Sequence, residues 1–390
     1  GSRAGDALMT DPTSSKDYIS FIYGFPDSDS LPAATIATAT NDVLTNNPVW
    51  SLQYGPVNGP PAIREALLAK LKRDQGINAG MDEILVTAGS SHAISLIVQL
   101  LVNPGETIIA EAPTFLGFFD DVVNTGAHIA NIEIDEDGMR VDQLEQALAD
   151  LKKAGKRCSM IYVLPNYQNP TGVSTTLDRR KRIVELAEEY DTLIVEDDAY
   201  FDLRYDGDAI PTIYSLDPNQ RTIYLGTLSK TLAAGFRIGW AVAPAPLIRR
   251  LAALKTDGGT NIFNSYVAAA WLPDNFERHV AELRQIYGTR RDLLLAALDK
   301  YMPEGTTWSV PHGGFFVWLT VPEGVNTATM LPQAREIGIE YLPGVACYFD
   351  DNGKNAMRLS FSFAHDDVID EGIRRLGDLI RAEMAEATTA

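Results

Sequence analysis

The middle of the chain alternates between short apolar runs and longer stretches in which apolar residues recur at helical spacing. Amphipathic stretches of this second kind cover residues 90–102, 141–154 and 177–190. Continuous apolar runs are typical of strands that are buried on both faces of a parallel sheet. The pattern therefore predicts an α/β unit whose mainly parallel seven-stranded sheet is flanked by helices. Its strands are expected at 84–87, 107–110, 129–134, 159–163, 192–196, 222–226 and 238–243.

The pattern differs on either side of this unit. Residues 19–32 form a strand-like run that Gly24, Pro26 and Pro32 interrupt, which indicates an irregular connection. A loop rich in Pro and Gly precedes a helical pattern near residues 63–71. From residue 274 to residue 301 one long helical stretch follows, and then shorter strands with one or two helices. We interpret residue 273 as a domain boundary.

Composition narrows the classes of protein. Of the 390 residues, 45% are hydrophobic and 22% charged, as in ordinary globular proteins, and the net charge of -19 would repel nucleic acids and anionic membranes. Cys158 and Cys347 lie far apart, which indicates neither a disulfide framework nor a metal cluster. No apolar run has the length of a membrane span, and the N-terminus lacks an apolar signal core. We expect a soluble cytoplasmic protein without a metal site.

The candidate chemistry centres on Lys230, which lies between two predicted strands in TIYLGTLSKTLAAGFRIGW (222–240). Its neighbours include Thr227, Ser229 and Arg237. A lysine amine can form a Schiff base, and hydroxyl and guanidinium groups bind phosphate. The stretch therefore favours pyridoxal 5'-phosphate. For this stretch alone, a surface loop with an ordinary lysine and a solvated arginine is the alternative.

Two further motifs directly follow predicted strands. Ser90 and Ser91 open a helix whose N-terminus favours an anion, although serine is also a common structural cap there. Asn169 lies in PNYQNPTG, where open α/β sheets bind ligands, although the composition alone favours a plain turn.

A third motif, VEDDAY, places carboxylates at the end of a buried strand. A buried carboxylate is costly unless it meets a cation, and a protonated pyridine nitrogen would supply one. Either Asp197 or Asp198 could take this place, because alternation along the strand does not distinguish them. Tyr200 could then hold the cofactor's 3'-oxygen.

Eight motifs occur in an order that resembles one known family. They read YGPVNGPPAIRE, TAGSSHAISL, EAPTF, QNPTGV, VEDDAY, LGTLSKTLAAGFRIGW, GGFFVW and NAMRLSFS, and they span nearly the whole chain. The chain resembles fold-type I pyridoxal-phosphate enzymes of the class I/II aminotransferases. It is most similar to the branch that holds 2-aminoadipate and kynurenine-type aminotransferases and the aminotransferase-like domains of certain GntR-type regulators. No winged-helix segment precedes the first motif, so the regulator architecture is not expected.

The resemblance implies a domain organisation and an assembly. A large cofactor-binding domain would cover residues 46–273, and a smaller α+β domain would cover 274–390, with the N-terminal segment 1–45 packed against it. The active unit would be a homodimer with shared sites, to which Tyr54 and the loop 258–265 contribute from the neighbouring subunit.

The resemblance also implies roles for the motif residues. Lys230 would bind the cofactor and move a proton, Asp197 would pair with the ring nitrogen, and Asn169 and Tyr200 would hold the 3'-oxygen. Phe115 would stack on the ring. The phosphate would be held by Ser90, Ser91, Thr227, Ser229, Arg237 and Tyr54. Arg358 would bind the substrate α-carboxylate, although the sequence alone favours a cross-strand surface arginine.

The implied reaction moves the α-amino group of an L-amino acid to a 2-oxo acid, which we expect to be 2-oxoglutarate. An oxidase, lyase or cyclase on the same fold is the alternative. Tyr23, Gly24 and Phe25 replace a Gly-Gly pair of the family, so we expect Tyr23 and Gly24 to contact the substrate. His92 replaces a glutamine and is expected to pack near the phosphate loop.

One expected feature of the family is poorly matched. Residues 3–18 do not resemble the helix that carries a substrate-gating arginine in many relatives. We therefore expect an amino donor that is aromatic or medium-sized and apolar more than dicarboxylic.

Overall fold

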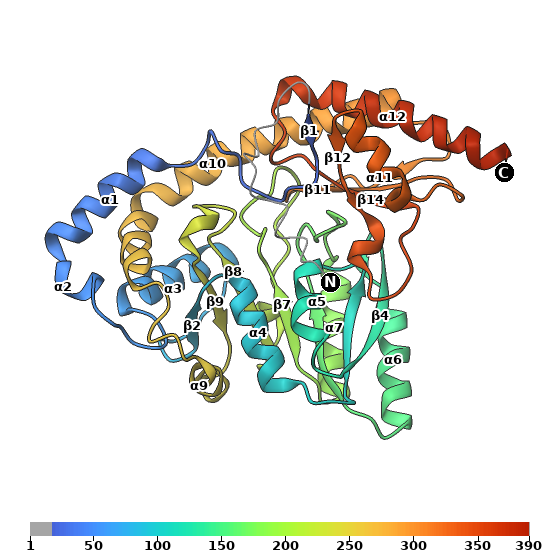
Figure 1. The fold of residues 1–390 in the computed structure, drawn as a ribbon. Coiled ribbons are helices and arrows are strands. Elements are labelled where there is room, and N and C mark those ends of the chain that lie inside the picture. The colour runs from blue at the N-terminus through green and yellow to red at the C-terminus, as the bar shows by residue number, and fades with distance from the viewer. Residues whose placement is uncertain (1–17, 390) are drawn as a thin grey trace.

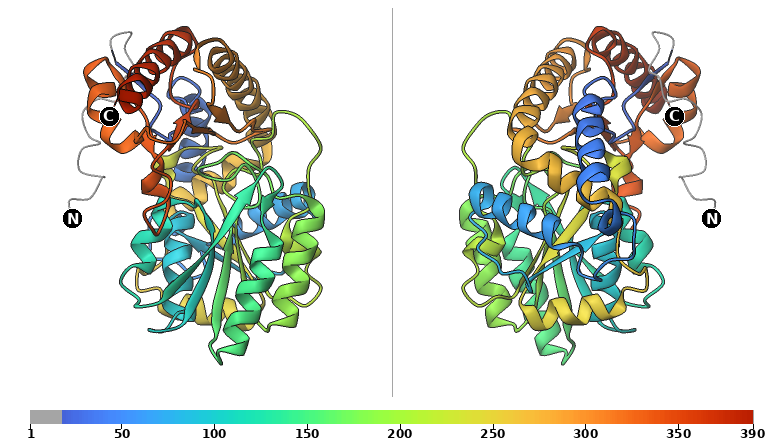
Figure 2. Two further views of the ribbon diagram at one scale, coloured as in Figure 1. Left: turned by 90° about the vertical axis from the view of Figure 1, so that its right-hand side faces the viewer. Right: turned by 90° about the vertical axis from the view of Figure 1, so that its left-hand side faces the viewer.

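The seven predicted strands lie in one sheet with helices on both of its faces (Figures 1 and 2). This sheet and its helices form the first layer of the structure. A computed structural model describes residues 18–389. Most neighbouring strands are parallel, and β9 runs antiparallel to both of its neighbours. In spatial order the strands are β2 (Ile84–Thr87), β9 (Gly239–Val242), β8 (Thr222–Thr227), β7 (Ile194–Asp197), β6 (Cys158–Val163), β3 (Thr107–Ala112), β4 (His128–Asp135) and β5 (Gly138–Met139).

Alternate residues of the strands pack against different helices. In β6, Met160 and Tyr162 belong to one apolar cluster, and Ile161 and Val163 belong to another. Burial on both faces explains why these strands read as continuous apolar runs. On the first face lie α4 (Ser90–Leu101), α5 (Leu116–Val122) and α9 (Ala245–Leu254); on the second lie α3 (Pro61–Gln75), α6 (Val141–Lys153), α7 (Leu177–Glu189) and α8 (Ile213–Leu216).

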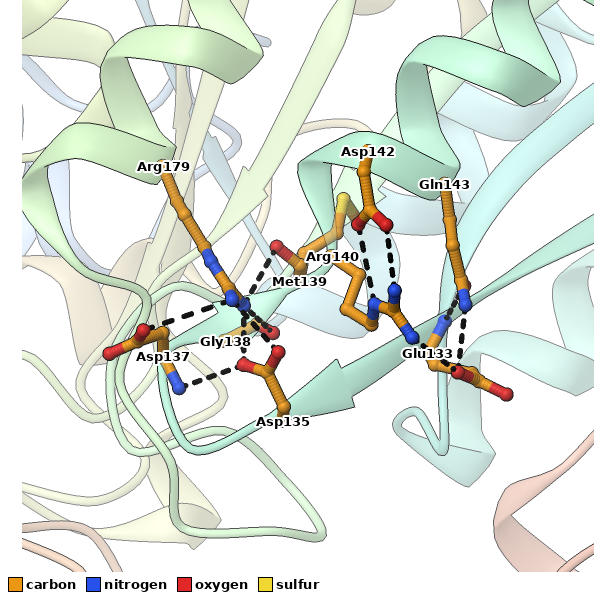
Figure 3. Close-up of polar contacts among 9 residues, drawn as sticks. All are labelled: Glu133, Asp135, Asp137, Gly138, Met139, Arg140, Asp142, Gln143 and Arg179. Carbon is orange, nitrogen blue, oxygen red and sulfur yellow. Dashed lines mark hydrogen bonds and ion pairs between the residues drawn. The ribbon is translucent and has the colours of Figure 1, made fainter.

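The sheet has eight strands, one more than the sequence pattern predicts. The added strand, β5, has two residues and pairs antiparallel with the end of β4. Figure 3 shows how Arg179 of α7 holds this turn, where its guanidinium donates to Gly138 O at 2.7 Å and to Asp135 Oδ2 at 2.8 Å. A strand this short has no apolar run of its own, so periodicity could not reveal it.

The C-terminal part of the chain forms a second layer above the carboxyl ends of the parallel strands (Figure 1). Its apolar core joins the N-terminal residues Ile19 and Phe21 to residues beyond 283. A four-stranded antiparallel sheet has the order β10 (Thr307–Trp308), β11 (Phe316–Thr320), β14 (Ala356–Ser360) and β13 (Leu342–Pro343), and β1 (Ile19–Ser20) pairs in parallel with β12 (Ile339–Glu340). The helices of this layer are α11 (Thr327–Glu336) and α12 (Asp366–Thr389).

One long helix links the two layers. Helix α10 runs from Ile262 to Tyr301 and contains Pro273, so the predicted boundary falls inside a continuous helix. The helix begins 12 residues before the predicted start at residue 274. Pro273 does not end the helix, because a proline can be accommodated inside a long helix when neighbouring packing supports the turn. Helices α1 (Ala33–Asn46) and α2 (Pro48–Ser51) precede the first layer, and α1 packs against α10. The division at residues 45 and 273 stays a prediction.

Arg180 of α7 fixes the loop that carries Asn169. The side chain is fully buried and donates to Pro165 O and Asn166 Oδ1, both at 2.7 Å, and to Thr175 O at 2.8 Å. It also reaches Pro211 O at 3.0 Å. One guanidinium thus satisfies the backbone of two loops that have no strand partner.

We predict that Arg180→Met lowers the free energy of unfolding by roughly 3 kcal/mol or more, because several buried acceptors lose their donor. Urea unfolding followed by tryptophan fluorescence measures this loss. Arg182→Met is the matched control, since Arg182 lies on the same helix in surface ion pairs and should cost less than about 1 kcal/mol. Equal losses for the two variants would contradict the prediction.

Candidate active site

Twelve of the predicted site residues line one cavity of about 310 Å³ at the carboxyl ends of the parallel strands. Strands β2, β3, β6, β7 and β8 each contribute through the loop that follows them, as is general for open α/β sheets. The second layer adds Arg358 of β14, and the N-terminal segment adds Gly24. The predicted residues that line the cavity are Gly24, Ser90, Ser91, Phe115, Asn169, Asp197, Tyr200, Thr227, Ser229, Lys230, Arg237 and Arg358.

Lys230 directs its amine into this cavity. Its Nζ donates to Gly24 O at 2.9 Å and lies 5.9 Å from the centre of the Tyr200 ring. The pKa of Lys230 is lowered to about 8, chiefly by burial and then by the nearby Arg358 and Arg237 guanidiniums, while Asp197 acts to raise it. A larger fraction of this amine is therefore neutral, and able to act as a nucleophile or base, than of an ordinary lysine at the same pH.

The structure distinguishes Asp197 from Asp198. Asp197 lines the cavity, whereas Asp198 points away and accepts hydrogen bonds from Asn166 Nδ2 at 2.9 Å and Tyr224 OH at 3.2 Å. Burial raises the pKa of Asp197 to about 6, although a hydrogen bond from Tyr162 and the Lys230 charge both act to lower it. Its Oδ1 is buried and has no partner among the described protein atoms. A protonated nitrogen of a ligand would satisfy this oxygen.

Hydroxyl groups and a guanidinium surround the start of α4. Thr227 Oγ1 donates to Ser229 Oγ at 2.9 Å, and Arg237 Nη1 lies 3.4 Å from the same oxygen. Gly89 precedes the helix with φ 84°, and a Cβ built there would lie 2.4 Å from Arg237 Nη2. Only glycine therefore fits between the helix start and this arginine. Free backbone N–H groups, the helix dipole and the guanidinium together favour a phosphate.

Arg358 is the second buried cation of the cavity. Only 5% of its surface is exposed, which corrects the surface position that the sequence alone favours. Its Nη1 donates to Asn169 Oδ1 at 3.0 Å and its Nη2 to Ile22 O at 2.6 Å, while Nε is buried and has no partner within residues 18–389. The guanidinium also lies 4.2 Å from the centre of the Phe316 ring. A buried, incompletely bonded guanidinium fits a ligand carboxylate.

Phe25 faces the cavity more directly than Tyr23 does. Phe25 lines the cavity and remains 40% exposed, whereas Tyr23 does not line it. The Tyr23 ring stacks on Phe25 with centroids 5.1 Å apart, and Phe363 packs edge-on against both rings. Tyr23 therefore lies behind Phe25, and its contact with the substrate stays a prediction.

Two other predicted residues lie outside the cavity. Tyr54 is 88% exposed and lies beside Gly258. His92 accepts a hydrogen bond from Ala88 N at 3.2 Å through Nδ1, which is the packing position expected for it. Burial lowers the pKa of His92 and favours the neutral ring that such an acceptor requires. Residues 3–17, where a gating arginine was sought, lie outside the described residues.

Two residues near the cavity were missed by sequence reasoning. Tyr162 of β6 donates its hydroxyl proton to Asp197 Oδ2 at 2.8 Å. Glu111 of β3 accepts from Leu164 N at 3.0 Å and Gln168 Nε2 at 3.3 Å, and burial raises its pKa to about 8. Both residues stand inside apolar runs, and a polar residue in such a run is the only signal that the sequence offered.

Other parts of the described chain carry less chemistry. A larger cavity, of about 480 Å³, lies beside Tyr167, contains none of the predicted site residues, and has charges that are largely paired, such as Arg73 with Asp74. Within residues 18–389 no three His, Cys, Asp or Glu side chains group as metal ligands would, and both cysteines are free and buried. No helix in that range is long and apolar enough to cross a membrane.

The donor set of the 310 Å³ cavity fits pyridoxal 5'-phosphate. Lys230 offers an amine for the aldehyde, and Asp197 Oδ1 offers an unpartnered acceptor for the ring nitrogen. The start of α4, with Ser229 and Arg237, offers donors for the phosphate. Arg358 remains available for a carboxylate of a second molecule.

Comparison with known proteins gives consistent matches over almost the whole chain. The family model described as aminotransferase class I and II matches residues 16–376. An aromatic-amino-acid aminotransferase of Thermococcus litoralis is 40% identical over 371 residues, which is 94% of this chain and 89% of that protein.

Two solved structures extend this likeness to the fold. The kynurenine aminotransferase of Pyrococcus horikoshii, in complex with PMP, KYN and KYA, has a TM-score of 0.92 and 38% identity, covering 98% of this chain and 97% of that one. The α-aminoadipate aminotransferase of Thermus thermophilus, complexed with N-(5'-phosphopyridoxyl)-L-leucine, has a TM-score of 0.88 and 29% identity, covering 95% and 94%.

The lowered pKa of Lys230 predicts a pH-dependent stability of the ligand-free protein. The unfolded lysine titrates near 10.5 and the folded one near 8, so the unfolded state binds more protons between these values and stability rises with pH across this window. Lys230→Met should therefore stabilise the ligand-free protein at pH 7, and its advantage should shrink toward pH 10.5.

Thermal unfolding of the ligand-free wild type and variant at pH 7, 8, 9 and 10 measures this difference. Lys181→Met, at an exposed position of α7, should change stability equally at all four values. A Lys230→Met advantage that does not vary with pH would show that the amine is not desolvated.

Proposed function

We propose an amino donor and an acceptor for this chain, which belongs to the aminotransferase class I and II family and is a pyridoxal-phosphate-dependent aminotransferase. Within the family it belongs to the branch that holds 2-aminoadipate and kynurenine aminotransferases. The donor would be an aromatic or medium-sized apolar L-amino acid, and the acceptor would be a 2-oxo acid, 2-oxoglutarate. The observation that carries the proposal is the cavity in which Lys230 stands between Asp197 and Arg358 beside an aromatic wall.

The residues around the cavity divide the chemical tasks. Bound pyridoxal phosphate supplies an electron sink that makes the Cα–H bond of an attached amino acid acidic. Phe115 would cover its ring, Asn169 and Tyr200 would hold its 3'-oxygen, and Asp197 Oδ1 would keep its ring nitrogen protonated. Its phosphate would be held by Ser90, Ser91, Thr227, Ser229 and Arg237, joined by Tyr54 of the neighbouring subunit. Lys230, with a pKa lowered to about 8, would take the proton from Cα and return it.

Arg358 would orient every substrate by its α-carboxylate. The guanidinium lies 4.2 Å from the centre of the Phe316 ring, and its Nε has no partner among the described residues, so a carboxylate could replace the contact with Ile22 O. Such a bidentate pair would place Cα next to Lys230. Amino and oxo acids share this carboxylate, so both half-reactions can use one site.

The donor side chain would meet aromatic residues. Phe25, backed by Tyr23 and Phe363, forms one wall of the cavity, and Phe316 forms another. Among the lining residues the structure describes, the cations are Lys230, Arg237 and Arg358, and each already has a proposed role. No further cation of this set is left for a distal carboxylate. The acceptor identity rests on the family resemblance, as the α-carboxylate site suits any 2-oxo acid.

We predict that kcat/KM for phenylalanine and kynurenine exceeds that for glutamate and 2-aminoadipate by about tenfold or more, with 2-oxoglutarate as acceptor. Phe25→Ala should lower kcat/KM for phenylalanine by about three- to tenfold, the value of one aromatic contact, and leave glutamate unchanged. Tyr23→Gly should act in the same direction but less strongly. A preference for 2-aminoadipate that neither variant changes would reveal a distal basic group outside the described residues.

The matched variant for this series is Arg358→Ala. It should lower kcat/KM for every donor and for phenylpyruvate, pyruvate and 2-oxoglutarate alike, because all share the α-carboxylate. The decrease should correspond to a loss of about 2 to 4 kcal/mol of transition-state stabilisation. A loss confined to one substrate class would contradict the role proposed for Arg358. Replacing 2-oxoglutarate by pyruvate or phenylpyruvate in the wild type tests the acceptor.

We also propose a homodimer. Residues 49–54 expose large apolar side chains in one stretch, including Val49, Trp50 and Leu52, with 64–68% of each exposed. Tyr54 follows and lies beside Gly258, so the two segments that the resemblance assigns to the neighbouring site are adjacent in this chain. An exposed apolar stretch of this kind is typical of a protein interface. The cytoplasmic location stays a prediction.

We predict a dimer in sedimentation at assay concentrations. Trp50→Asp should shift the equilibrium toward monomer and lower activity in parallel, because a buried carboxylate at the interface has no partner. Val123→Asp, at an equally exposed apolar position outside the stretch, is the control and should change neither. Full activity of a monomer would overturn the shared site.

A further inference from the structure

Tyr162 is buried in β6 with its ring stacked on Phe118, with centroids 3.9 Å apart and planes 12° apart. Its hydroxyl lies 2.8 Å from Asp197 Oδ2. The register explains this contact. Tyr162 pairs with Val195 on the neighbouring strand, and Asp197 lies two residues further along the same face, within the reach of a tyrosine side chain.

The two carboxylate oxygens of Asp197 consequently differ. Oδ2 accepts from Tyr162, whereas Oδ1 is buried without a partner among the described protein atoms and belongs to a residue that lines the cavity. Burial holds the pKa of the Tyr162 hydroxyl well above its ordinary value, so this group keeps its proton and acts only as a donor toward the carboxylate. A hydrogen bond to a buried carboxylate favours its ionised form and fixes its orientation.

We propose that Tyr162 is a positioning residue that holds the Asp197 carboxylate ionised, with Oδ1 presented to the ring nitrogen of the cofactor. This inference rests on the role proposed for Asp197. Tyr162 does not line the cavity, so it would act through one oxygen of the Asp197 carboxylate while the other remains available.

The chain contains a matched control on the opposite face of the sheet. Tyr224 of β8 pairs with Glu196, and its hydroxyl donates to Asp198 Oδ2 at 3.2 Å, two residues further on. This is the same diagonal arrangement of a buried tyrosine and an aspartate. Asp198, however, does not line the cavity. Removing each hydroxyl therefore separates a general effect of a buried tyrosine from an effect on the cofactor.

The test measures binding to the cofactor-free protein by fluorescence titration. The probes are pyridoxamine 5'-phosphate, which has no aldehyde for Lys230, and its 1-deaza analogue, in which carbon replaces the ring nitrogen. Tyr162→Phe should weaken the binding of pyridoxamine 5'-phosphate by roughly tenfold, as expected for the loss of a hydrogen bond to a charged group. It should weaken the binding of the deaza analogue by less than about threefold. Tyr224→Phe should leave the ratio of the two affinities unchanged.

Asp197→Asn serves as the reference variant. It should abolish the preference for the natural ring over the deaza analogue. If it does so and Tyr162→Phe leaves the preference intact, or weakens both probes equally, the positioning role of Tyr162 is overturned and only packing remains. If Asp197→Asn itself leaves the preference intact, the role proposed for Asp197 fails first, and the inference fails with it.

A second substitution covers the case in which Tyr162→Phe does not fold. 3-Fluorotyrosine at position 162 keeps the ring and the hydroxyl but has a more acidic O–H, which is a stronger donor. It should increase the preference for pyridoxamine 5'-phosphate over the deaza analogue. An unchanged or reduced preference would overturn the inference.

Discussion

The site depends on keeping three ionisable groups buried close together where a sheet ends. These groups, Asp197, Lys230 and Arg358, would each be better solvated in water. Burial raises the pKa of the Asp197 carboxyl and lowers the pKa of Lys230 and of Arg358, which favours the neutral form of each group. Their charges partly compensate, since Lys230 lowers the pKa of Asp197 and Asp197 raises that of Lys230. The compensation is incomplete, because two buried atoms, Asp197 Oδ1 and Arg358 Nε, have no hydrogen-bond partner in the part of the chain that the structure describes. A cofactor and a substrate carboxylate can satisfy them.

The rest of the fold supports this arrangement from two sides. The parallel sheet supplies Asp197 from the end of β7 and Lys230 from the loop after β8, and both positions are fixed by strands buried on both faces. The C-terminal layer supplies Arg358 from an antiparallel strand, paired with Trp318 and Leu342. Neither layer holds the complete set. The junction is therefore the place where a charged pocket can form without exposing its ions to bulk water.

The N-terminal segment closes the same pocket through its backbone. Arg358 donates to Ile22 O and Lys230 donates to Gly24 O, so both cations use carbonyls of one short segment. Its far end is anchored where Arg290 donates to buried Asp27 at 2.8 Å. The segment thus covers the cations with neutral acceptors, which a carboxylate can displace because a charged acceptor binds a guanidinium more strongly.

The sequence by itself determined the layered α/β fold, the seven long strands and most of the cavity lining. These depend on local signals, namely continuous apolar runs and the loops directly after them, and on motifs that resemble a known family. Residues such as Ser90, Asn169 and Lys230 could be placed because each follows its strand by a fixed short distance.

Only the tertiary structure decided which side chains meet across strands and layers. Alternation along the strand left both Asp197 and Asp198 open, and only the resemblance named Asp197. The position of Asp197 in the cavity, the bond from Tyr162 and the burial of Arg358 beside Asn169 depend on strand register and on how the second layer sits on the first. A shift of one residue in that register would turn Asp197 to the opposite face of the sheet. Such contacts join residues far apart in the chain, and local periodicity does not encode them.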